Sequence, residues 1–391
     1  MNCATGHSLL FITILTEAER KGKTIMWLVI FGLMIFAMFA GVFYLVNRFY
    51  KIPITEKLSG GRKPVRILIA VIPLAVIVGG CWLAWGMTNA IVVSLHVCAV
   101  WLIADLISFI VRKIRKKDGN YTVRAVSVLA FSAVYLGVGW YLAHHVWRTQ
   151  YNVETDKTFG ELRIVQISDS HVGATFHADG FAEQIERINA ETPDIVVVTG
   201  DFVDDGTSLA DMEESSKALG DLKTKYGVYF VFGNHDKGYY GDERRGYSTA
   251  DLVANLEANN VTVLEDENVL IDDRFYLIGR QDASEESRAE MSELFKEIDN
   301  SRYTIVLDHQ PNDYDAEEAV GADMVLSGHT HGGQLIPITY VGEWTGVNDA
   351  TYGIEKRGET TFITSSGISD WEIKFKTGCK SEYSVIDISD T

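Results

Sequence analysis

Four long apolar runs in the first 147 residues limit what this part of the chain can fold into. A helix of about 20 apolar residues crosses a hydrocarbon core about 30 Å thick. A cleavable signal peptide would account for the first run only. We therefore predict four transmembrane helices over residues 25–147. The runs are Ile25–Val46 without a charge, Val65–Met87 with Arg66, Asn89–Val111 with Asp105, and Thr122–Trp147 with Arg124.

Lysine and arginine are concentrated in two of the three short loops between these runs. If Arg66 and Arg124 at the starts of the second and fourth runs are included, the first and third loops hold six each, and the loop around Thr88 holds none. Because positively charged loops stay on the cytoplasmic side, we predict a multi-pass protein of the cytoplasmic membrane whose chain after Trp147 is extracytoplasmic. Arg20, Lys21 and Lys23 argue against this orientation.

Residues 1–24 form an irregular leader, and Met26 would be a natural start. Our hypothesis is that the leader is not native. N-terminal sequencing of the native protein would reject this hypothesis if it found residues 1–24.

Asp105 lies within the third apolar run, and a carboxylate inside a membrane span is by default a functional candidate. The alternative is that it lies within two turns of the cytoplasmic end, where water or Arg112 can reach it. We favour the alternative.

The charge of the chain is divided unevenly. Residues 1–150 have a balance of +11 and residues 151–391 a balance of −29. The second part therefore does not favour a nucleic-acid partner, because binding to a phosphate backbone depends on Lys and Arg. It also holds a single cysteine, Cys379, which excludes a thiolate zinc site.

After a polar linker at 148–161, β-type runs alternate with helical patterns over residues 162–391. Strands separated by helices indicate a largely parallel sheet. Two late β runs, Thr361–Thr364 and Tyr383–Ile388, have little helix between them. We therefore predict an α/β domain with a two-sheet β core flanked by helices. The predicted helices are 181–189, 212–222, 252–259 and 288–298.

Five apolar runs in this part end at side chains that can bind a divalent cation. In α/β sheets, sites form at the carboxyl ends of strands. If the last strand continues, His329 and His331 project to the same side and can aim at one point, although a surface strand can carry His-x-His without an ion. The runs are Ile164–Ile167 before Asp169 and His171, Ile195–Val198 before Asp201, Val228–Phe232 before Asn234, Thr304–Leu307 before His309, and Asp323–Leu326 before His329 and His331.

In this order the five blocks, Asp-x-His, Gly-Asp, Gly-Asn-His-Asp, His and Gly-His-x-His, resemble the calcineurin-like metallophosphoesterase superfamily over about residues 162–387. The Gly328–Gln334 segment and the Ser366–Gly367 turn resemble its membrane-associated bacterial branch, which often has N-terminal transmembrane helices. The resemblance implies one metal ion held by Asp169, His171 and His331, a second held by Asn234, His309 and His329, and Asp201 bridging them. A carboxylate has two oxygens and can span two cations, whereas an imidazole ligates one.

The same resemblance implies a reaction. Two cations about 3.5–4 Å apart can clamp a phosphoryl group and lower the pKa of a bridging water, so that hydroxide attacks phosphorus. Ligands of nitrogen and oxygen suit Mn²⁺, Fe, Zn²⁺, Co²⁺ or Mg²⁺, and Mn²⁺ is our first choice.

Several neighbouring residues are candidates for other roles. His235 is predicted to stabilise or protonate the leaving group, with Asp236 orienting its ring, or else to be a structural histidine. Asp204 and Asp205 either orient ligands or are solvated loop acids, and His177 is expected at the surface. Tyr239, Tyr240 and Arg244 either contact substrate at the rim of the site or belong to a flexible crossover.

The sequence therefore predicts a membrane-anchored, dinuclear-metal phosphohydrolase that cleaves phosphoesters, with phosphodiesters favoured. Its tether to the bilayer favours a phospholipid, a lipid-linked sugar phosphate or an envelope polymer as substrate. One alternative is a non-catalytic membrane sensor or scaffold that binds a phosphate ligand. Another is a transporter-like role for the helices, which their single internal acid supports weakly. The oligomeric state and the physiological substrate stay open.

Overall fold

A computed structural model describes residues 32, 36–117, 119–158 and 160–390. The chain divides into two compact units, Met1–Val134 and Tyr135–Thr391. The predicted leader at 1–24 and the beginning of the first apolar run lie outside the described residues.

The N-terminal unit is helical. Residues 36–50 form a helix, followed by α2 (Pro53–Ser59) and the 53-residue α3 (Lys63–Arg115). A straight helix of that length would be about 80 Å long, more than twice a hydrocarbon core. Gly86 interrupts it with non-helical dihedrals, φ 85° and ψ 172°. Gly86 lies one residue before the end of the predicted span Val65–Met87, close to the loop expected around Thr88, and the structure joins the two predicted spans into one element.

Among the residues that the structure describes, two helices are long and apolar enough to cross a membrane, α3 and α4 (Tyr121–His144). The prediction of four such helices is therefore met only in part. Residues 135–144 of α4 belong to the C-terminal unit, so the unit boundary falls inside a helix.

Asp105 is paired inside the N-terminal unit. Its carboxylate lies 2.8 Å from Arg48 Nε and 3.3 Å from Arg124 Nη1, and it accepts a 2.7 Å hydrogen bond from the Tyr44 hydroxyl. A carboxylate in apolar surroundings is stable only when it is paired in this way. The sequence did not indicate these partners, and the Asp105 carboxylate is also 19% exposed.

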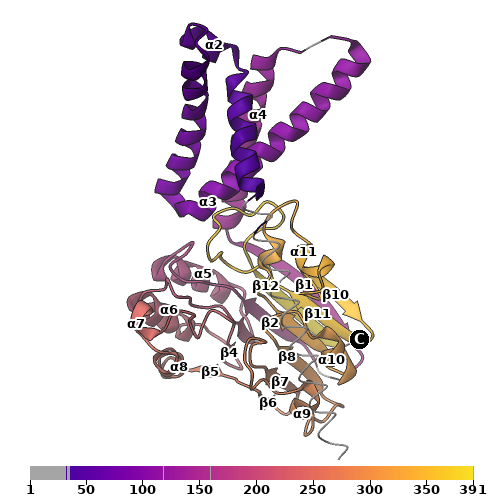
Figure 1. Ribbon diagram of the computed structural model, residues 1–391. Coiled ribbons are helices and arrows are strands. Elements are labelled where there is room, and N and C mark those ends of the chain that lie inside the picture. The colour runs from indigo at the N-terminus through magenta and orange to yellow at the C-terminus, as the bar shows by residue number, and fades with distance from the viewer. Residues whose placement is uncertain (1–31, 33–35, 118, 159, 391) are drawn as a thin grey trace, which may run out of the picture. The chain divides into compact units, whose positions relative to one another are not determined.

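The C-terminal unit is an α/β domain with two mixed six-stranded sheets (Figure 1), which confirms the predicted two-sheet core. The first sheet has the order β1 (Trp147–Thr155), β12 (Glu382–Asp390), β2 (Leu162–Ile167), β3 (Ile195–Thr199), β4 (Val228–Val231), β5 (Val261–Val263). The second has the order β10 (Gly353–Arg357), β11 (Thr360–Thr364), β9 (Met324–Ser327), β8 (Tyr303–Leu307), β7 (Phe275–Gly279), β6 (Glu267–Ile271). Strands β2 to β5 are parallel to one another, as are β7, β8, β9 and β11.

The strands nearest the middle of each sheet are apolar along both faces because both faces are covered. In β3, Ile195 and Val197 join the core shared with the second sheet, whereas Val196 and Val198 join the core under the helices. The helices on this outer face are α5 (Ala178–Ala190), α6 (Leu209–Gly220) and α8 (Thr249–Ala258), and α9 (Met291–Leu294) and α10 (Tyr314–Ala319) cover the second sheet.

Two predicted segments differ from the structure. The segment 148–161 was predicted as a linker, but most of it is β1, which pairs with β12 along nine residues. Its outward side chains are polar because β1 is an edge strand with one half-exposed face. The helix predicted at 288–298 is reduced to the four residues of α9.

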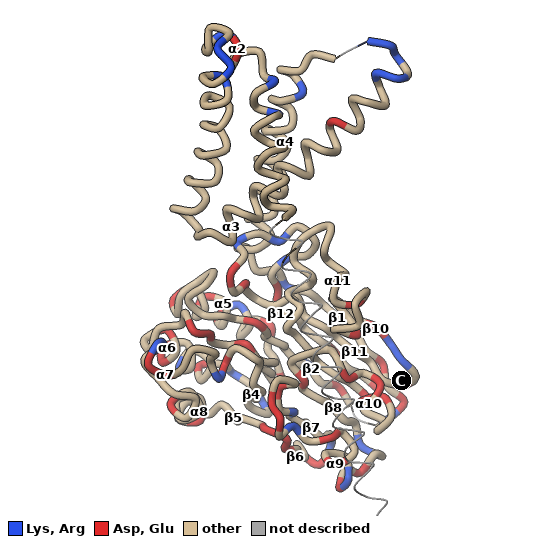
Figure 2. Tube along the Cα trace, in the orientation of Figure 1, with Lys and Arg blue, Asp and Glu red and all other residues tan. Residues whose placement is uncertain are grey.

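Figure 2 shows acidic residues distributed along the chain of the C-terminal unit. This distribution agrees with the balance of −29 for residues 151–391.

Candidate metal site

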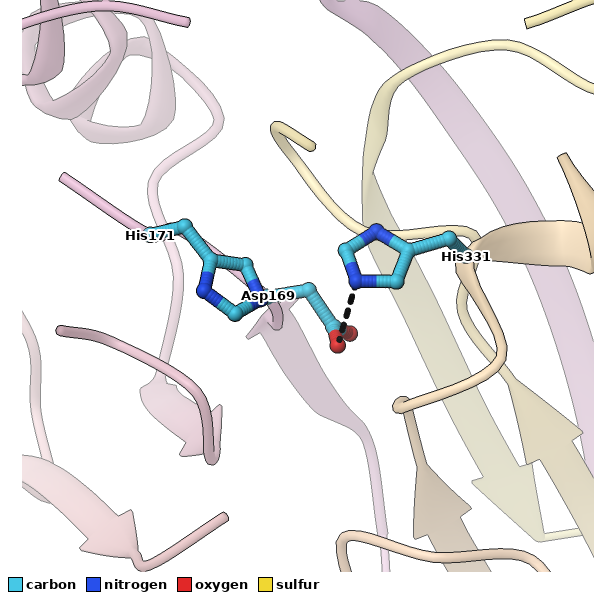
Figure 3. Close-up of side chains that lie close together, drawn as sticks. All are labelled: Asp169, His171 and His331. Atoms are coloured by element: carbon cyan, nitrogen blue, oxygen red, sulfur yellow. Dashed lines mark ion pairs between the residues drawn. The ribbon is translucent and has the colours of Figure 1, made fainter. Parts of the chain in front are cut away.

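Strands β2, β3 and β4 of the first sheet and β8 and β9 of the second end close together, and the predicted ligands follow them. Two groups of potential ligands result, each with its donor atoms within 4.8 Å of one another. The first comprises Asp169, His171 and His331 (Figure 3), and the second Asp201, His309 and His329. Both sheets therefore contribute to each group.

Asp201 connects the two groups through one atom. Its Oδ2 lies 3.2 Å from His309 Nε2, in the second group, and 3.6 Å from His171 Nε2, in the first. The side chain is buried. A single carboxylate thus faces imidazoles of both groups.

Asn234 adds an oxygen to the second group. Its amide Oδ1 lies 3.2 Å from His309 Nε2, while its Nδ2 donates a 2.7 Å hydrogen bond to the Tyr239 hydroxyl. Tyr239 therefore fixes which end of the amide faces the imidazole. This contact gives Tyr239 a role in orienting Asn234 that its sequence position did not indicate.

The distances of 3.2 Å from His309 Nε2 to Asp201 Oδ2 and to Asn234 Oδ1 are those of ligands that share one cation. Two ligands about 2.1 Å from one ion, at angles of 90–109°, lie about 3.0–3.5 Å apart. The Nε2 atom of His171, which faces Asp201, is buried and has no hydrogen-bond partner within the described part of the chain. The donor set of imidazole, carboxylate and amide oxygen suits a divalent cation of the Mn²⁺, Fe or Zn²⁺ type. The residues present therefore fit a metal ion.

The charges also favour a cation. Burial lowers the pKa of His329 to about 4, so its imidazole is neutral, which is the form that binds metals. Burial lowers the pKa of His309 too, but the Asp201 carboxylate outweighs it and raises that pKa well above its ordinary value. A positive charge is thus stabilised beside Asp201, and metal binding at His309 would displace this proton.

The backbone at these residues is unusual. Five candidate ligands have φ values in the left-handed region: Asp169 at 52°, His171 at 37°, Asp201 at 52°, His329 at 67° and His331 at 48°. Such conformations cost on the order of 1–3 kcal/mol each and cluster at functional sites.

This backbone also corrects the expectation for His329 and His331. Strand β9 ends at Ser327, so the two histidines do not continue a strand, and His331 opens the 3₁₀ turn η1 (His331–Gly333). They enter different groups instead of aiming at one point.

Two glycines let the strand ends approach closely. A Cβ at Gly328 would lie 1.8 Å from Ser168 Oγ and 2.5 Å from Asp169 Oδ2. A Cβ at Gly233 would lie 2.3 Å from Asp201 Oδ1. Any larger residue at either position would displace a candidate ligand.

The outer nitrogens of the imidazoles face groups that orient them. The Nδ1 atoms of His309, His171 and His331 lie 2.8 Å from Thr199 O, 3.3 Å from Asp204 Oδ2 and 3.8 Å from Asp370 Oδ1, respectively. Asp204 thus faces a candidate ligand, which favours the first of the alternatives considered for it.

Asp205 has a different function. It accepts hydrogen bonds from the backbone N–H groups of Tyr239 and Tyr240 and anchors the loop after Asn234. Tyr240 and Arg244 lie at the surface, with the guanidinium 4.6 Å from the Tyr240 ring centre. His177 is 71% exposed in its side chain and pairs with Asp211 at 3.0 Å, as expected for a surface residue.

Sequence reasoning missed Asp370 and Lys376. Asp370 is fully buried, accepts a 3.1 Å hydrogen bond from Gln334 Nε2 and lies 3.4 Å from Lys376 Nζ. Both residues border a segment in which Trp371, Ile373 and Phe375 alternate with charged residues, as in a strand, although the structure forms no strand there. The only available signal was the adjacent Ser366–Gly367 turn.

His235 lies beside the two groups without belonging to either. Its ring centre is 5.1 Å from those of His171 and Tyr239 and 5.4 Å from that of Trp371. Its backbone N–H donates a 2.8 Å hydrogen bond to Asp201 Oδ1. The ring is half-buried, so it faces both the groups and the outside.

Asp236 was predicted to orient the His235 ring, and the structure gives it other partners. Its carboxylate accepts hydrogen bonds from the backbone N–H groups of Asp201 (2.8 Å), Gly233 (2.7 Å) and Val203 (3.0 Å). Burial, followed by the charge of Asp201, raises its pKa to about 7, although the hydrogen bonds from Gly233 and Val203 lower it. Asp236 therefore shapes the turn that carries Asp201.

Asp236→Ala is expected to lower the free energy of unfolding by about 3 kcal/mol or more, because three buried N–H groups lose their acceptor at about 1–3 kcal/mol each. The melting temperature would fall by about 6–12 °C, measured by thermal unfolding of the full chain in detergent. Glu359→Ala is the control, since its side chain is 96% exposed. Equal melting temperatures for the two variants would contradict this role of Asp236.

Comparison with known proteins agrees with this geometry. Residues 162–333 match the family model of calcineurin-like phosphoesterases. An uncharacterized metallophosphoesterase of Campylobacter jejuni is 26% identical over 298 residues, covering 73% of this chain and 76% of that protein. One from Helicobacter pylori is 30% identical over 267 residues, covering 63% of this chain and 69% of that protein. A Bos taurus protein named transmembrane protein with metallophosphoesterase domain is 29% identical over 245 residues, covering 58% of this chain and 52% of that protein.

Proposed function

The chain belongs to the calcineurin-like phosphoesterase family, and on this premise we propose that it is a membrane-anchored hydrolase that cleaves phosphoesters with two divalent cations. The observation that carries the proposal is Asp201 Oδ2, which lies 3.2 Å from an imidazole of one ligand group and 3.6 Å from an imidazole of the other. A carboxylate shared between two ions would take such a position.

In this proposal Asp169, His171 and His331 hold one cation. Asn234, His309 and His329 hold the other, and Asp201 bridges them. Two such ions supply Lewis-acid charge for the phosphoryl oxygens and a hydroxide nucleophile near neutral pH. Mn²⁺ is our first choice among the ions that this donor set suits.

His235 is proposed to give the leaving group its proton. The backbone N–H of His235 donates a hydrogen bond to Asp201, the residue shared by the two ligand groups. This bond holds the His235 ring beside both groups. Tyr239 and Trp371 flank the ring and limit its rotation. Burial lowers the pKa of His235, which makes its imidazolium a stronger acid for the leaving oxygen.

Membrane association is supported by the two apolar helices α3 and α4 and by the similarity to the Bos taurus transmembrane protein. We further propose four spans, since Gly86 divides α3 into two lengths and residues 36–50 add another helix. The basic loops would then be cytoplasmic and the catalytic domain extracytoplasmic. Such a tether favours a phosphodiester of a lipid or an envelope polymer as substrate.

The alternative is a sensor or scaffold that binds a phosphate ligand without turnover. The presence of every candidate ligand together with His235 argues against it. Hydrolysis of bis-p-nitrophenyl phosphate by the full chain in detergent with added Mn²⁺ separates the two proposals. A preparation that binds the metal and releases no nitrophenol would favour the sensor.

Metal removal should destabilise the protein. Treatment with a chelator is expected to lower the melting temperature by about 5–10 °C, since a ligand at about 100 times its Kd contributes about 2.7 kcal/mol. Re-addition of Mn²⁺ should restore it, as measured by thermal unfolding. Asp201→Ala serves as the comparison, because the chelator and added Mn²⁺ should change its melting temperature much less than that of the wild type. Identical unfolding of the wild type with and without metal would contradict a resident ion.

A further inference from the structure

One exposed segment of the C-terminal unit is apolar along most of its length. We call residues 336–347 the apolar loop, which includes the short helix α11 (Val341–Trp344). Its only charged residue is Glu343. Soluble surfaces rarely expose such a continuous apolar patch without a partner. The large apolar side chains exposed on it are Ile336 (51%), Ile338 (56%), Tyr340 (51%), Val341 (40%), Trp344 (73%) and Val347 (44%).

The apolar loop begins directly after the candidate metal site. Gln334 follows η1, and its side chain donates to Asp370, which faces the outer nitrogen of His331. A cavity of about 210 Å³ lies between the two regions and is lined by Thr330, Gln334 and Ile338 among others. A molecule held at the apolar loop would therefore be within reach of the site.

Hydrogen bonds also tie the apolar loop to the end of α4. Ile336 N–H donates to Thr377 Oγ1 (2.9 Å), and Thr377 N–H donates to Gln334 O (2.8 Å). The neighbouring Lys376 N–H donates to Gly139 O in α4 (2.9 Å). All of these residues belong to the C-terminal unit.

The contact with α4 lies more than one helical turn before the last residue of the helix. A Cβ at Gly139 would lie 2.9 Å from Thr377 Cγ2, so the chain at Thr377 packs against the helix backbone. Gly139 precedes the last helical residue, His144, by five positions, which is about 7–8 Å along the axis. The beginning of the apolar loop at Ile336 therefore lies beside the last turns of α4.

We propose that the apolar loop inserts into the surface of the bilayer that α4 crosses, and that the site therefore acts on phosphoesters of membrane amphiphiles. This inference rests on the proposed membrane-anchored hydrolase. Trp and Tyr rings are favoured at the level of the headgroups. Apolar side chains of an interfacial helix enter the boundary with the acyl chains by about 5–10 Å. An amphiphile in the same leaflet then needs to expose only its phosphoester to reach the ligand groups.

The test is the depth of the apolar loop in a bilayer. The full chain, with its native cysteines replaced by serine, carries Trp344→Cys with a nitroxide label and is reconstituted into vesicles of phosphatidylcholine and phosphatidylglycerol. Collisions with oxygen, which concentrates in lipid, should exceed collisions with a water-soluble nickel chelate severalfold. Leu209→Cys is the control, since Leu209 is 41% exposed at the start of α6, and there the nickel chelate should dominate. Ile338→Cys gives a second position if the first variant does not fold.

The outcomes separate cleanly. Dominant nickel collisions at both loop positions would overturn the proposal, and low collisions with both reagents would overturn it in favour of a protein partner. Hydrolysis of bis-p-nitrophenyl phosphate by the unlabelled wild-type chain is measured in parallel. If the label lies in lipid but the wild-type chain does not hydrolyse the diester, the result counts against the proposed function alone. If the wild-type chain hydrolyses the diester but the label is exposed to water, the result counts against this inference alone.

Discussion

Alanine in place of Asp201 is expected to lower kcat/KM for bis-p-nitrophenyl phosphate by about 10³-fold or more. The carboxylate oxygen that faces both ligand groups disappears, and the two cations lose the anion that holds them together. Stabilisation of phosphoryl charge by metal ions is worth several kcal/mol, and about 4 kcal/mol corresponds to this factor. Metal analysis by mass spectrometry should find that the variant retains at most one of two equivalents.

Asp205→Ala is the matched control for this variant. The two carboxylates lie in the same loop, but Asp205 accepts hydrogen bonds from the backbone of Tyr239 and Tyr240. Its loss should leave both metal equivalents in place and reduce activity far less than the loss of Asp201. Full activity of Asp201→Ala would remove the basis of the two-cation proposal.

Alanine in place of His235 is expected to reduce hydrolysis by about 10²–10⁴-fold, the usual contribution of a general acid, while both metal equivalents stay bound. The imidazole lies beside the groups without entering either of them. The loss should depend on the leaving group. Nitrophenolate leaves without a proton, whereas an alkoxide leaving group needs a proton. The variant should therefore lose less activity on the nitrophenyl diester than on an alkyl phosphodiester.

His177→Ala is the control, because that histidine is exposed and paired with Asp211. Steady-state kinetics with both substrates should leave it at the wild-type level. An equal loss for nitrophenyl and alkyl leaving groups in His235→Ala would indicate that His235 binds substrate and transfers no proton.

The fold of the C-terminal unit could be predicted largely because its strands are short, apolar and separated by clear helical patterns. Ile195–Val198, for example, is apolar on both faces, and the structure buries both faces. The edge strand β1 was missed because its polar residues resemble a linker, and its strand character depends on pairing with β12, more than two hundred residues away.

The gathering of the candidate ligands could be predicted because each follows a strand, and a strand end places a side chain at the edge of the sheet. Their surroundings were not. The contact of Asp370 with His331 and the hydrogen bonds of Asp236 depend on loop conformations with no local signature. The left-handed backbone of His329 and His331 likewise arises from the tertiary turn after β9 and not from the His-x-His spacing.

In the N-terminal unit, the sequence predicted a loop around Thr88, and the structure breaks α3 two residues earlier, at Gly86. Apolar length alone could not predict that the two spans stay joined in one helix, because the non-helical backbone in α3 is confined to that single residue. Similarly, the partners of Asp105 come from helices distant in sequence. Nearness along the chain pointed to Arg112 instead.

Both sheets supply ligands to each of the two groups. With two ions bound, metal coordination would hold the two sheets together along one edge. Neither sheet could then move relative to the other without breaking a bond between a ligand and a metal ion. Adjustment to substrates of different shape must then come from the surface segments around the rim, while the floor of the site keeps its dimensions through every turnover.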